Sequence, residues 1–359
     1  MGDKKQKILV INPGSTSTKI AIFKDNEMVY SETIDHDPVE IKKFGSIYGQ
    51  YELRLSEISR KLLERDIDLS GLTAVIGRGG YVRPVKSGTY KVNGLMLEEL
   101  TSARNGEHAS NLGAILAGEF SKKHGIPAFI TDPTVVDEMS ELAKFTGWPK
   151  IKRRSQWHPL NQKACARRAA AQLGKKYTDS NLIVAHLGGG ITVGVHEKGV
   201  AVDVNDGLLG DGPFSLDRPG GLPTSAVMEL CFEEGATFES VKKKLLGNAG
   251  MYAHLGVTDA RIVEKEILSG NKKYELVFKA LAYNIAKEIG KCAAVLKGRV
   301  DAIVITGGLA YNKMLMGWLE EYVSFISRII YFPGGYEMEA MAEAVTRVLN
   351  GEEQALEYV

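Results

Sequence analysis

Residues 181–204 read NLIVAHLGGGITVGVHEKGVAVDV, which is three apolar runs separated by a glycine turn and a charged turn. Short apolar runs bounded by turn residues predict β-strands, so this stretch predicts a three-stranded antiparallel meander. The first predicted strand leads through His186 into Gly188, Gly189 and Gly190. Glycine has no Cβ and adopts backbone angles that other residues resist, so a ligand can approach such a turn closely. The stretch therefore predicts the start of a sheet and a place where that sheet can bind a ligand.

The same order of elements occurs near the N-terminus, where residues 7–34 read KILVINPGSTSTKIAIFKDNEMVYSETI. Two copies of one three-strand unit indicate two related domains that arose by duplication. The first turn of this copy, residues 12–18, carries one glycine and four hydroxyl side chains, whose donors can converge on phosphate oxygens. An ordinary β-hairpin explains the same residues equally well. The phosphate-binding interpretation gains from the repeat, because the two turns occupy equivalent positions.

Strands and helices alternate after each meander, as apolar spacing shows. Helical stripes are expected at Leu53, Ile58 and Leu62, at Val277, Leu281, Ile285 and Ile289, and at Met341, Val345 and Val348. Further strands are expected at 72–76, 127–131, 301–306 and 329–332. This pattern predicts an α/β protein with two domains, each a mixed sheet flanked by helices, and a ligand cleft between them. The expected division is 1–134 plus 337–359 for the N-terminal domain and 135–336 for the C-terminal domain.

Composition excludes several classes of protein. The 359 residues are 44% apolar, which is enough for two cores, and 45 basic residues balance 44 acidic ones for a formal charge of +1. That balance gives no broad cationic surface for nucleic acid or for an anionic membrane. No run approaches the roughly 20 apolar residues of a membrane helix, so a cytoplasmic protein with no membrane partner is expected. Cys165, Cys231 and Cys292 lack metal or disulfide spacing and are expected to be small core residues.

A third glycine turn follows the strand expected at 301–306, in the sequence ITGGLAYN at 305–312. A strand-to-helix turn of this kind can seat a ribose or an adenine against the backbone, although it also occurs without any ligand. Neither G-x-G-x-x-G nor G-x-x-x-x-G-K-[ST] occurs in the chain. Dinucleotide-binding dehydrogenases and Walker-type ATPases are therefore disfavoured.

Four strings resemble motifs of the acetate and butyrate kinase family, which is also called the acetokinase family. They are NPGSTSTK at 12–19, AHLGGG at 185–190, DGPFSLDRPGGLP at 211–223 and ITGGLAYN at 305–312. Within the family, the strings are most similar to those of butyrate kinases. The glycine turns are similar to the phosphate-1, phosphate-2 and adenosine motifs of the superfamily of sugar kinases, heat-shock ATPases and actin. The resemblance covers nearly the whole chain. It implies two duplicated ribonuclease H-like domains of the actin-like ATPase type, with the active site in the interdomain cleft.

The same resemblance implies an activity. Members transfer the γ-phosphoryl group of ATP reversibly to a short-chain fatty acid and so form an acyl phosphate. ATP or ADP is then the co-substrate, Mg²⁺ or Mn²⁺ the metal, and a homodimer or higher homo-oligomer the expected assembly. The chain departs from the acetate kinases at Gly189, where they carry asparagine, and after Arg218, where PGG replaces SGD. Both departures argue against acetate as the preferred acid, and the overall match to butyrate kinases implies butyrate or isobutyrate.

Individual roles also follow from the resemblance. The arginines on the substrate side fall on Arg78 and Arg218, the histidine that contacts the phosphoryl group on His186, and two further active-site histidines on His108 and His158. The nucleotide positions are Asn12, Ser15, Ser17, Lys19, His186, Gly188, Gly189, Gly190, Gly307, Gly308 and Asn312. The positions associated with the metal are Asn12, Glu337 and Asp132, of which Asp132 is also counted as catalytic.

The chemistry of this reaction suits these residue types. A carboxylic acid with a pKa of roughly 4 to 5 is ionised at neutral pH, so its oxygen needs no general base. The obstacle is repulsion between that anion and the γ-phosphoryl group, whose charge spreads over three oxygens. The planar forks of Arg78 and Arg218, with a divalent metal, can neutralise both anions. Which arginine serves which anion stays open.

Alternatives remain at each level. Taken alone, each arginine is more often a surface ion pair, His186 a structural hydrogen-bonding residue and Glu337 a partner for a helix dipole. Asp132 could equally cap a turn. An acetate or propionate kinase is the alternative within the family. A sugar or polyol kinase would need a carboxylate base, for which Asp203 or Asp206 are candidates. A non-catalytic ATP switch would use the same turns only to set an interdomain angle.

Overall fold

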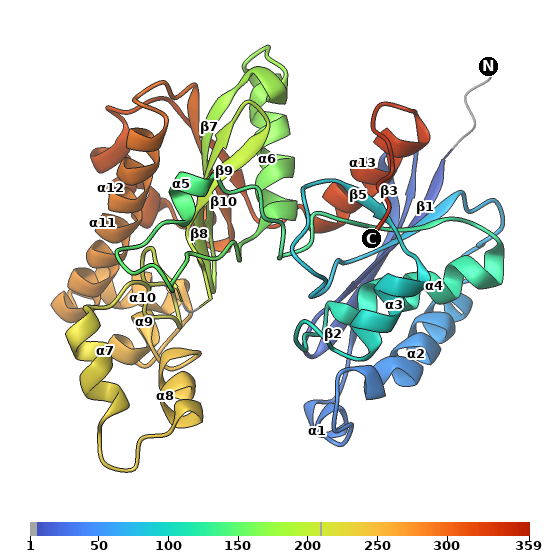
Figure 1. Ribbon diagram of the computed structural model, residues 1–359, viewed down its shortest axis with the longest axis horizontal. Helices are drawn as coiled ribbons and strands as arrows, with labels where there is room; N and C mark the ends of the chain where they lie inside the picture. Colours follow the sequence, from blue (N-terminus) through green and yellow to red (C-terminus); the bar gives the residue numbers. More distant parts are fainter. Residues whose placement is uncertain (1–5, 209) are drawn as a thin grey trace. The chain divides into compact units, whose positions relative to one another are not determined.

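The structure is a computed structural model that describes residues 6–208 and 210–359. The chain forms two compact units, Met1–Val136 with Tyr336–Val359, and Asp137–Gly335 (Figure 1). It passes from the first unit to the second after Val136 and returns at Tyr336, so the last helix belongs to the first unit. Both units are mixed α/β layers, and the expected fold class is confirmed.

The first unit is built on a six-stranded sheet of order β3-β2-β1-β4-β6-β5. Its strands are β1 (Lys7–Pro13), β2 (Ser17–Lys24), β3 (Glu27–Asp35), β4 (Ala74–Gly77), β5 (Thr89–Lys91) and β6 (Ala128–Thr131). The meander β1-β2-β3 is antiparallel, β4 and β6 extend it in parallel with β1, and β5 closes the edge antiparallel to β6. The short strand β5 is the one strand of this sheet that the apolar pattern does not predict.

Helices cover both faces of this sheet. They are α1 (Pro38–Lys42), the 3₁₀ turn η1 (Tyr48–Gln50), α2 (Tyr51–Glu64), α3 (Gly94–Thr101), α4 (Asn111–His124) and α13 (Glu337–Leu349). Figure 1 shows α2, α3 and α4 on one side of the strands and α13 on the other. Leu9 and Ile11 of β1 lie in one apolar core with Ile58 and Leu62 of α2. The stripe predicted for α2 needs one correction, because the third buried residue is Arg54 and not Leu53, which is half-buried.

The C-terminus is attached to the first unit by a buried carboxylate. Glu99 of α3 has no exposed surface, and it accepts hydrogen bonds from Arg83 Nε at 2.8 Å and from the Tyr358 hydroxyl at 2.6 Å. Asn93 Nδ2 donates to the Tyr358 carbonyl at 2.7 Å. The bond from Arg83, followed by that from Tyr358, lowers the pKa of Glu99 to about 2.

The Glu99 contact makes stability depend on pH. Because the folded pKa of Glu99 lies below the ordinary value of 4.5, the stabilisation is complete above about pH 4.5 and is lost as the pH falls towards about 2. Glu99→Gln should lower the free energy of unfolding by about 1–3 kcal/mol at neutral pH. Thermal unfolding from pH 3 to pH 7 should show the two melting curves converging in acid. Glu98→Gln, on the exposed face of the same helix, is the matched control, and a constant difference for Glu99→Gln at every pH would refute this assignment.

The second unit repeats the plan on a five-stranded sheet of order β11-β10-β7-β8-β9. Its strands are β7 (Asn181–Leu187), β8 (Ile191–Glu197), β9 (Val200–Val204), β10 (Ala302–Gly307) and β11 (Ile329–Pro333). The meander β7-β8-β9 is antiparallel, and β10 and β11 follow in parallel with β7. The arrangement β3-β2-β1-β4-β6 thus recurs as β9-β8-β7-β10-β11, and the predicted duplication is confirmed.

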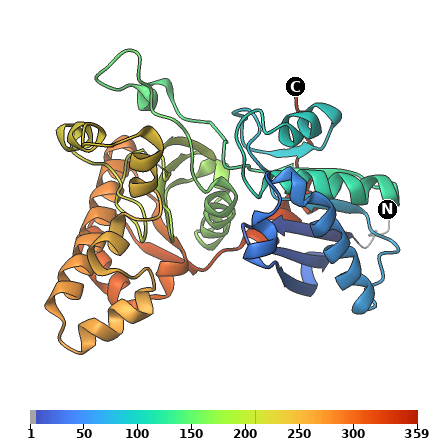
Figure 2. The same ribbon diagram turned by 90° about the horizontal axis from the view of Figure 1, so that it is seen from below.

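Helices again lie on both faces of the second sheet, with α11 and α12 on one side and α6 on the other (Figure 1). The elements are α5 (Glu141–Lys144), α6 (Pro159–Gln172), η2 (Tyr177–Asp179), α7 (Thr224–Cys231), α8 (Phe238–Leu245), α9 (Gly250–Leu255), α10 (Ala260–Leu268), α11 (Lys272–Val295), η3 (Gly308–Tyr311) and α12 (Lys313–Val323). Figure 2 shows α5 on the long green segment that precedes α6. None of the helices within 6–208 and 210–359 has the length and apolar character needed to span a membrane.

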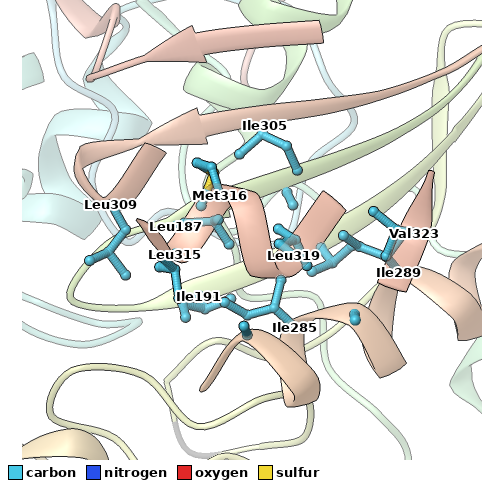
Figure 3. Close-up of a cluster of buried hydrophobic side chains, with 14 of the residues drawn as sticks. Leu187, Ile191, Ile285, Ile289, Ile305, Leu309, Leu315, Met316, Leu319 and Val323 are labelled. Atoms are coloured by element: carbon cyan, nitrogen blue, oxygen red, sulfur yellow. The ribbon is translucent and has the colours of Figure 1, made fainter. Parts of the chain in front are cut away.

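The core of the second unit holds both glycine turns in place. Leu187 and Ile191 flank the first turn and Leu309 follows the second, and all three pack with Ile285 of α11 and Leu315 of α12 (Figure 3). Alternate residues of β7 face the other way, towards α6, and His186 is one of them. The prediction for the cysteines was partly wrong: Cys165 and Cys292 are buried, but Cys231 is exposed on α7, a helix with no buried residue.

Candidate functional site

Three of the predicted residues of the first unit lie at the carboxyl ends of its parallel strands. Asn12 is the second-last residue of β1, Arg78 directly follows β4 and Asp132 directly follows β6. Ile11 pairs with Gly77 and Ile76 pairs with Phe129, so the three strands end at the same edge of the sheet. This edge is where α/β sheets bind their ligands.

Arg78 is held by the acidic start of α13. Its Nη1 forms an ion pair with Glu337 Oε2, and the same oxygen accepts a hydrogen bond of 2.8 Å from Asn12 Nδ2. The sequence predicted Glu337 and Asn12 as metal positions, whereas in this structure Glu337 binds both Asn12 and Arg78. The side chain of Arg78 is 15% exposed, so it is not fully enclosed.

The backbone of Arg78 lies directly on helix α4. A Cβ on Gly77 would come within 1.9 Å of the Gly113 carbonyl oxygen, and a Cβ on Gly113 within 2.2 Å of the Arg78 carbonyl oxygen. Backbone atoms cannot move away as a flexible side chain can, so only glycine fits at these two positions. Gly77 and Gly113 therefore place the backbone of Arg78.

Asp132 has the features of a cation ligand. It is 6% exposed, its Oδ1 accepts from Ser87 Oγ at 2.6 Å and from Gly88 N at 3.0 Å, and no ion pair to a lysine or arginine occurs for it among the described residues. Its φ of +39° is strained for a residue with a side chain, and such strain gathers at functional sites. A nearly buried carboxylate without a basic partner fits a divalent cation. Groups of three or more His, Cys, Asp or Glu suited to a metal are absent from the described part of the chain, so most of the coordination would have to come from the ligand.

The first hairpin turn rests on a buried arginine that the sequence analysis missed. Arg54 of α2 has no exposed surface, and its guanidinium donates to the carbonyls of Ser15 and Ser17, both at 3.1 Å, and to Thr18 Oγ1 at 3.0 Å. Its remaining acceptor is Gln50 Oε1, so none of the described acceptors is a carboxylate. Burial lowers the pKa of Arg54 to about 10. A cation without an acidic partner thus lies directly behind the turn predicted to bind phosphate.

The other predicted residues of this turn point outward. Ser15 and Lys19 are exposed and Ser17 is half-buried. Arg54 holds the carbonyls of Ser15 and Ser17, and Gly14 N donates to the Ser17 carbonyl at 2.7 Å. The turn is therefore a preformed loop with hydroxyl and ammonium groups on its outer side, as a phosphate-binding turn requires.

His108 lies near Arg78. Its ring stacks on Tyr81 with centroids 5.3 Å apart, and its Nδ1 is 2.7 Å from Ser110 Oγ. The packing around the ring, followed by the positive charge of Arg78, lowers the pKa of His108. His108 is therefore predominantly neutral at pH 7 and can act as a hydrogen-bond donor or acceptor without adding charge.

In the second unit, the three glycines between β7 and β8 serve different purposes. A Cβ on Gly190 would come within 2.5 Å of Arg218 Nη1, so Gly190 makes room for that guanidinium. A Cβ on Gly189 would have nothing within 4 Å, so that side of Gly189 is open space. Arg218 Nη1 also donates to the Gly207 carbonyl at 2.7 Å, and Ser215 Oγ donates to the Gly189 carbonyl at 2.5 Å. The loop that contains Ser215 and Arg218 therefore holds the glycine turn and leaves Gly189 accessible.

Two histidines stack beside this turn. The rings of His186 and His158 lie 4.0 Å apart at an angle of 14°. His186 Nδ1 is 2.8 Å from Asn161 Oδ1 on α6. The other ring nitrogen of His186, Nε2, faces the turn, because a Cβ added to Gly188 would lie 3.5 Å from it. Asn161 is 2% exposed, and its Nδ2 has no partner among the described residues. A buried amide donor without an acceptor, beside a histidine that faces the glycine turn, marks a place for an anionic ligand.

The third glycine turn borders a cavity of about 660 Å³, a size suited to a nucleotide. Gly188, Gly189 and Gly308 line it together with the start of α10 and Tyr311. A Cβ on Gly308 would have nothing within 4 Å, so a ligand can approach there. Gly307 has a φ of +91°, and a Cβ on it would lie 2.3 Å from the Leu187 carbonyl oxygen. Gly307 is therefore required by the backbone conformation and by packing. The predicted nucleotide residue Asn312 caps α12, with Oδ1 accepting from Leu315 N at 2.8 Å and Nδ2 donating to Glu264 Oε2 at 2.7 Å.

The sequence analysis missed the far wall of this cavity. The cavity is also lined by Asp259, which is the N-cap of α10, and by Arg261 and Glu264 of that helix. The only signal for them was the N-cap pattern of a short helix, since Asp259 accepts a hydrogen bond from Arg261 N. Such a pattern is common in helices that bind nothing.

Comparison with known proteins fits this geometry. The model of the acetokinase family matches residues 147–319. Butyrate kinase 1 of Clostridium acetobutylicum is 47% identical over 352 residues, which are 98% of this chain and 99% of that protein. The chain therefore belongs to the acetokinase family, and the resemblance seen in its motifs is confirmed.

Solved structures agree on the fold. The acetate kinase of Porphyromonas gingivalis has a TM-score of 0.79 at 19% identity, over 95% of this chain and 99% of that one. The propionate kinase of Francisella tularensis has a TM-score of 0.72 at 18% identity, over 94% and 98% of the two chains. At such identities these likenesses establish the two-domain architecture alone.

Proposed function

We propose that the protein is a carboxylate kinase that transfers the γ-phosphoryl group of ATP reversibly to a short-chain fatty acid, with butyrate or isobutyrate preferred. Its place in the acetokinase family and its 47% identity to a butyrate kinase support this reaction and this acid. The observation that carries the proposal is Arg218, a permanent cation that lies against the glycine turn. Asp203, one of the two candidate bases for a sugar kinase, is instead held by Arg153 Nη1 at 2.7 Å.

In the proposed reaction, a carboxylate oxygen of the acid attacks the γ-phosphorus of ATP. The new oxygen–phosphorus bond forms as the bond to the β–γ bridging oxygen breaks, and ADP leaves with that electron pair. No proton is transferred, because the acid is already ionised at neutral pH. The protein has only to bring two anions together and to stabilise the charge that spreads over the γ-oxygens.

The second unit is proposed to hold the phosphates. The open backbone at Gly189 admits them, and the fork of Arg218 beside Gly190 donates to the γ-oxygens. The unused amide of Asn161 adds a donor on the neighbouring side, and its Oδ1 accepts from Nδ1 of His186 and so fixes that ring. The adenosine occupies the cavity bordered by Gly308.

The first unit is proposed to hold the acid and the metal. The guanidinium of Arg78 binds the carboxylate, while Glu337, itself held by Asn12, fixes its Nη1. Asp132 would hold Mg²⁺ or Mn²⁺ through its carboxylate. That ion would neutralise phosphate charge and orient the ATP oxygens. The hydroxyls of Ser15 and Ser17 and the ammonium of Lys19 contact phosphate oxygens.

The choice of acid depends on a few apolar contacts. Each added methylene contributes about 0.8 kcal/mol, or about fourfold in binding, so butyrate, with two more methylenes, gains about 15-fold over acetate. The proposal also retains the family expectations of a cytoplasmic location and a homo-oligomeric state.

A hydroxamate assay tests the proposed function. The protein is incubated with ATP, Mg²⁺, hydroxylamine and unbranched acids of two to five carbons, and the acyl hydroxamate is measured for each acid. We expect the highest kcat/KM at four carbons, with acetate at least tenfold lower. Asp203→Asn should retain acyl transfer, because the carboxylate reaction needs no base there.

Two results would overturn the proposal. The first is that no acid gives a hydroxamate and that the protein instead phosphorylates a sugar with ATP. Loss of that activity in Asp203→Asn or Asp206→Asn would indicate the sugar kinase. The second is nucleotide binding without turnover of any acceptor, which would indicate the switch protein. A maximum at two or three carbons would keep the carboxylate kinase and change its acid.

A further inference from the structure

A path of buried polar side chains leads from His158 into the second unit, behind the glycine turn. His158 Nδ1 lies 2.8 Å from Thr192 Oγ1 of β8, and Gln162 of α6 donates to the same hydroxyl oxygen at 2.8 Å. Gln162 Oε1 lies 3.1 Å from His196 Nε2, and His196 Nδ1 lies 2.7 Å from the Tyr177 hydroxyl. Thr192, Gln162 and His196 have no exposed surface. None of the roles assigned above uses this path.

The direction of the hydrogen bonds can be worked out from one fixed point. Gln162 Nε2 lies 3.0 Å from the Thr192 carbonyl, which can only accept, so this end of the side chain is the amide nitrogen. Gln162 Oε1 therefore faces His196, and His196 must carry a proton on Nε2. Burial, followed by the charges of Lys163 and Arg167, lowers the pKa of His196 well below its usual value. The His196 ring is neutral, and its Nδ1 accepts from the Tyr177 hydroxyl.

The same argument fixes the proton on His158. Thr192 Oγ1 already accepts a hydrogen from Gln162, and its own proton has one acceptor among the residues described, His158 Nδ1. A buried hydroxyl is stable only when its proton is used. Thr192 therefore donates to His158 Nδ1, and the neutral ring of His158 carries its hydrogen on Nε2, on the opposite side of the ring from Thr192.

A glycine in the middle of β8 makes room for this path. A Cβ on Gly194 would lie 2.4 Å from Gln162 Oε1 and 3.2 Å from His196 Nε2. Glycine inside a strand weakens the strand, and it is found where another group approaches closely. Here that group is the hydrogen bond between Gln162 and His196.

We infer that Thr192 and Gln162 are positioning residues that hold His158 in its Nε2–H tautomer, stacked on His186, so that its ring presents a neutral N–H donor to the ligand. The inference deepens the proposed function and rests on it for the identity of that ligand, a phosphoryl oxygen. The tautomer itself is a property of the free protein. Removing the Thr192 hydroxyl leaves Nδ1 without its donor, so the proton is free to move to Nδ1 and the donor on Nε2 is lost.

The tautomer can be read directly. Protein with ¹⁵N-labelled histidine is studied by NMR above the titration range of histidine, where each ring nitrogen shows whether it carries hydrogen. The resonances of His158 are assigned by their loss in His158→Asn. We expect hydrogen on Nε2 in the wild type and a mixture of both tautomers in Thr192→Val and in Gly194→Ala. Thr192→Ser keeps the hydroxyl and should restore the wild-type pattern.

Kinetics provide the second readout. Thr192→Val should lower kcat for acyl phosphate formation by about 10- to 100-fold while the KM values for ATP and for the acid change little. Thr192→Ser should remain within a few-fold of the wild type. The matched control is Thr346→Val on α13, in the other unit. This substitution also removes a buried hydroxyl, which donates to Asn26 Oδ1 at 2.7 Å. It should change neither kcat nor the tautomer of His158.

The outcomes separate this inference from the proposed function. Hydrogen on Nδ1 of His158 in the wild type, or an unchanged tautomer and kcat in Thr192→Val, overturns the inference and leaves the reaction intact. The wild-type protein could instead be inactive with every acid but still carry hydrogen on His158 Nε2, with that tautomer disturbed in Thr192→Val. This result would overturn the proposed reaction and support the positioning role of Thr192. If Thr192→Val does not fold, Gly194→Ala and Thr192→Ser decide the question through the same two readouts.

Discussion

Arg218→Lys is expected to lower kcat for acyl phosphate formation by about 10³-fold, with circular dichroism and melting temperature close to those of the wild type. A lysine keeps the positive charge but has a single ammonium group. It cannot donate both to the Gly207 carbonyl, as Arg218 Nη1 does at 2.7 Å, and to the γ-oxygens in a fixed plane. The loss should fall mainly on kcat, because the charge on those oxygens is greatest in the transition state.

The control for this substitution is Arg299→Lys in the same unit. Arg299 is exposed and lies before β10, at the end of the strand opposite the glycine turn, and its backbone carbonyl accepts from Asn181. Its substitution should leave kcat and KM unchanged. A kcat for Arg218→Lys within tenfold of the wild type would contradict the role given to the guanidinium fork.

Gly113→Ala is expected to destabilise the first unit by about 3 kcal/mol and to lower activity at least about 10²-fold, even at temperatures where the variant is folded. The added methyl group would lie 2.2 Å from the Arg78 carbonyl oxygen and 2.6 Å from Arg78 N. The contact is between two backbones, so either β4 or α4 must shift, and Arg78 shifts with it. Thermal unfolding and the hydroxamate assay measure the two effects separately.

Gly118→Ala on the same helix is the matched control. A Cβ there would meet only the Leu97 and Val92 side chains, at 3.6 Å and beyond. Because alanine favours helices more than glycine does, this variant should be as stable as the wild type or more stable, by up to about 1 kcal/mol. Equal effects of the two substitutions would show that α4 does not place Arg78.

The sequence predicted the parts of the fold that depend on local patterns. Apolar runs of the length of a strand, with glycine or hydroxyl turns between them, predicted both meanders, and their repetition predicted the duplication. Helical spacing predicted the core face of α11 from Val277 to Ile289, and all of these positions pack in the core. The short strand β5 was missed because its three residues carry no periodic signal.

Other features depend on contacts between distant segments, which no local pattern encodes. Arg54 occupies a position where the apolar stripe of α2 predicts a hydrophobic side chain, and only the hairpin turn from Ser15 to Thr18 explains it. The glycines of AHLGGG looked equivalent, but Gly190 packs against Arg218, about thirty residues further along the chain, whereas Gly189 lies open.

The polar residues at the start of α6 show the same limit. His158 was predicted from the family motif, but Asn161 and Gln162 read as ordinary helical residues. Their functions became visible only when β7 and β8 brought His186 and Thr192 beside them. Buried polar groups are defined by their partners, so a single sequence does not reveal them.

The central claim is that the carboxylate oxygen itself attacks the γ-phosphorus. Butyrate labelled with ¹⁸O in both carboxylate oxygens tests it, with ATP, Mg²⁺ and hydroxylamine present. Hydroxylamine attacks the carbonyl carbon of the acyl phosphate and releases phosphate together with the bridging oxygen. We predict that each released phosphate carries one ¹⁸O atom and that the nucleotide product is unlabelled ADP. Unlabelled phosphate, or AMP that carries the label, would contradict the account.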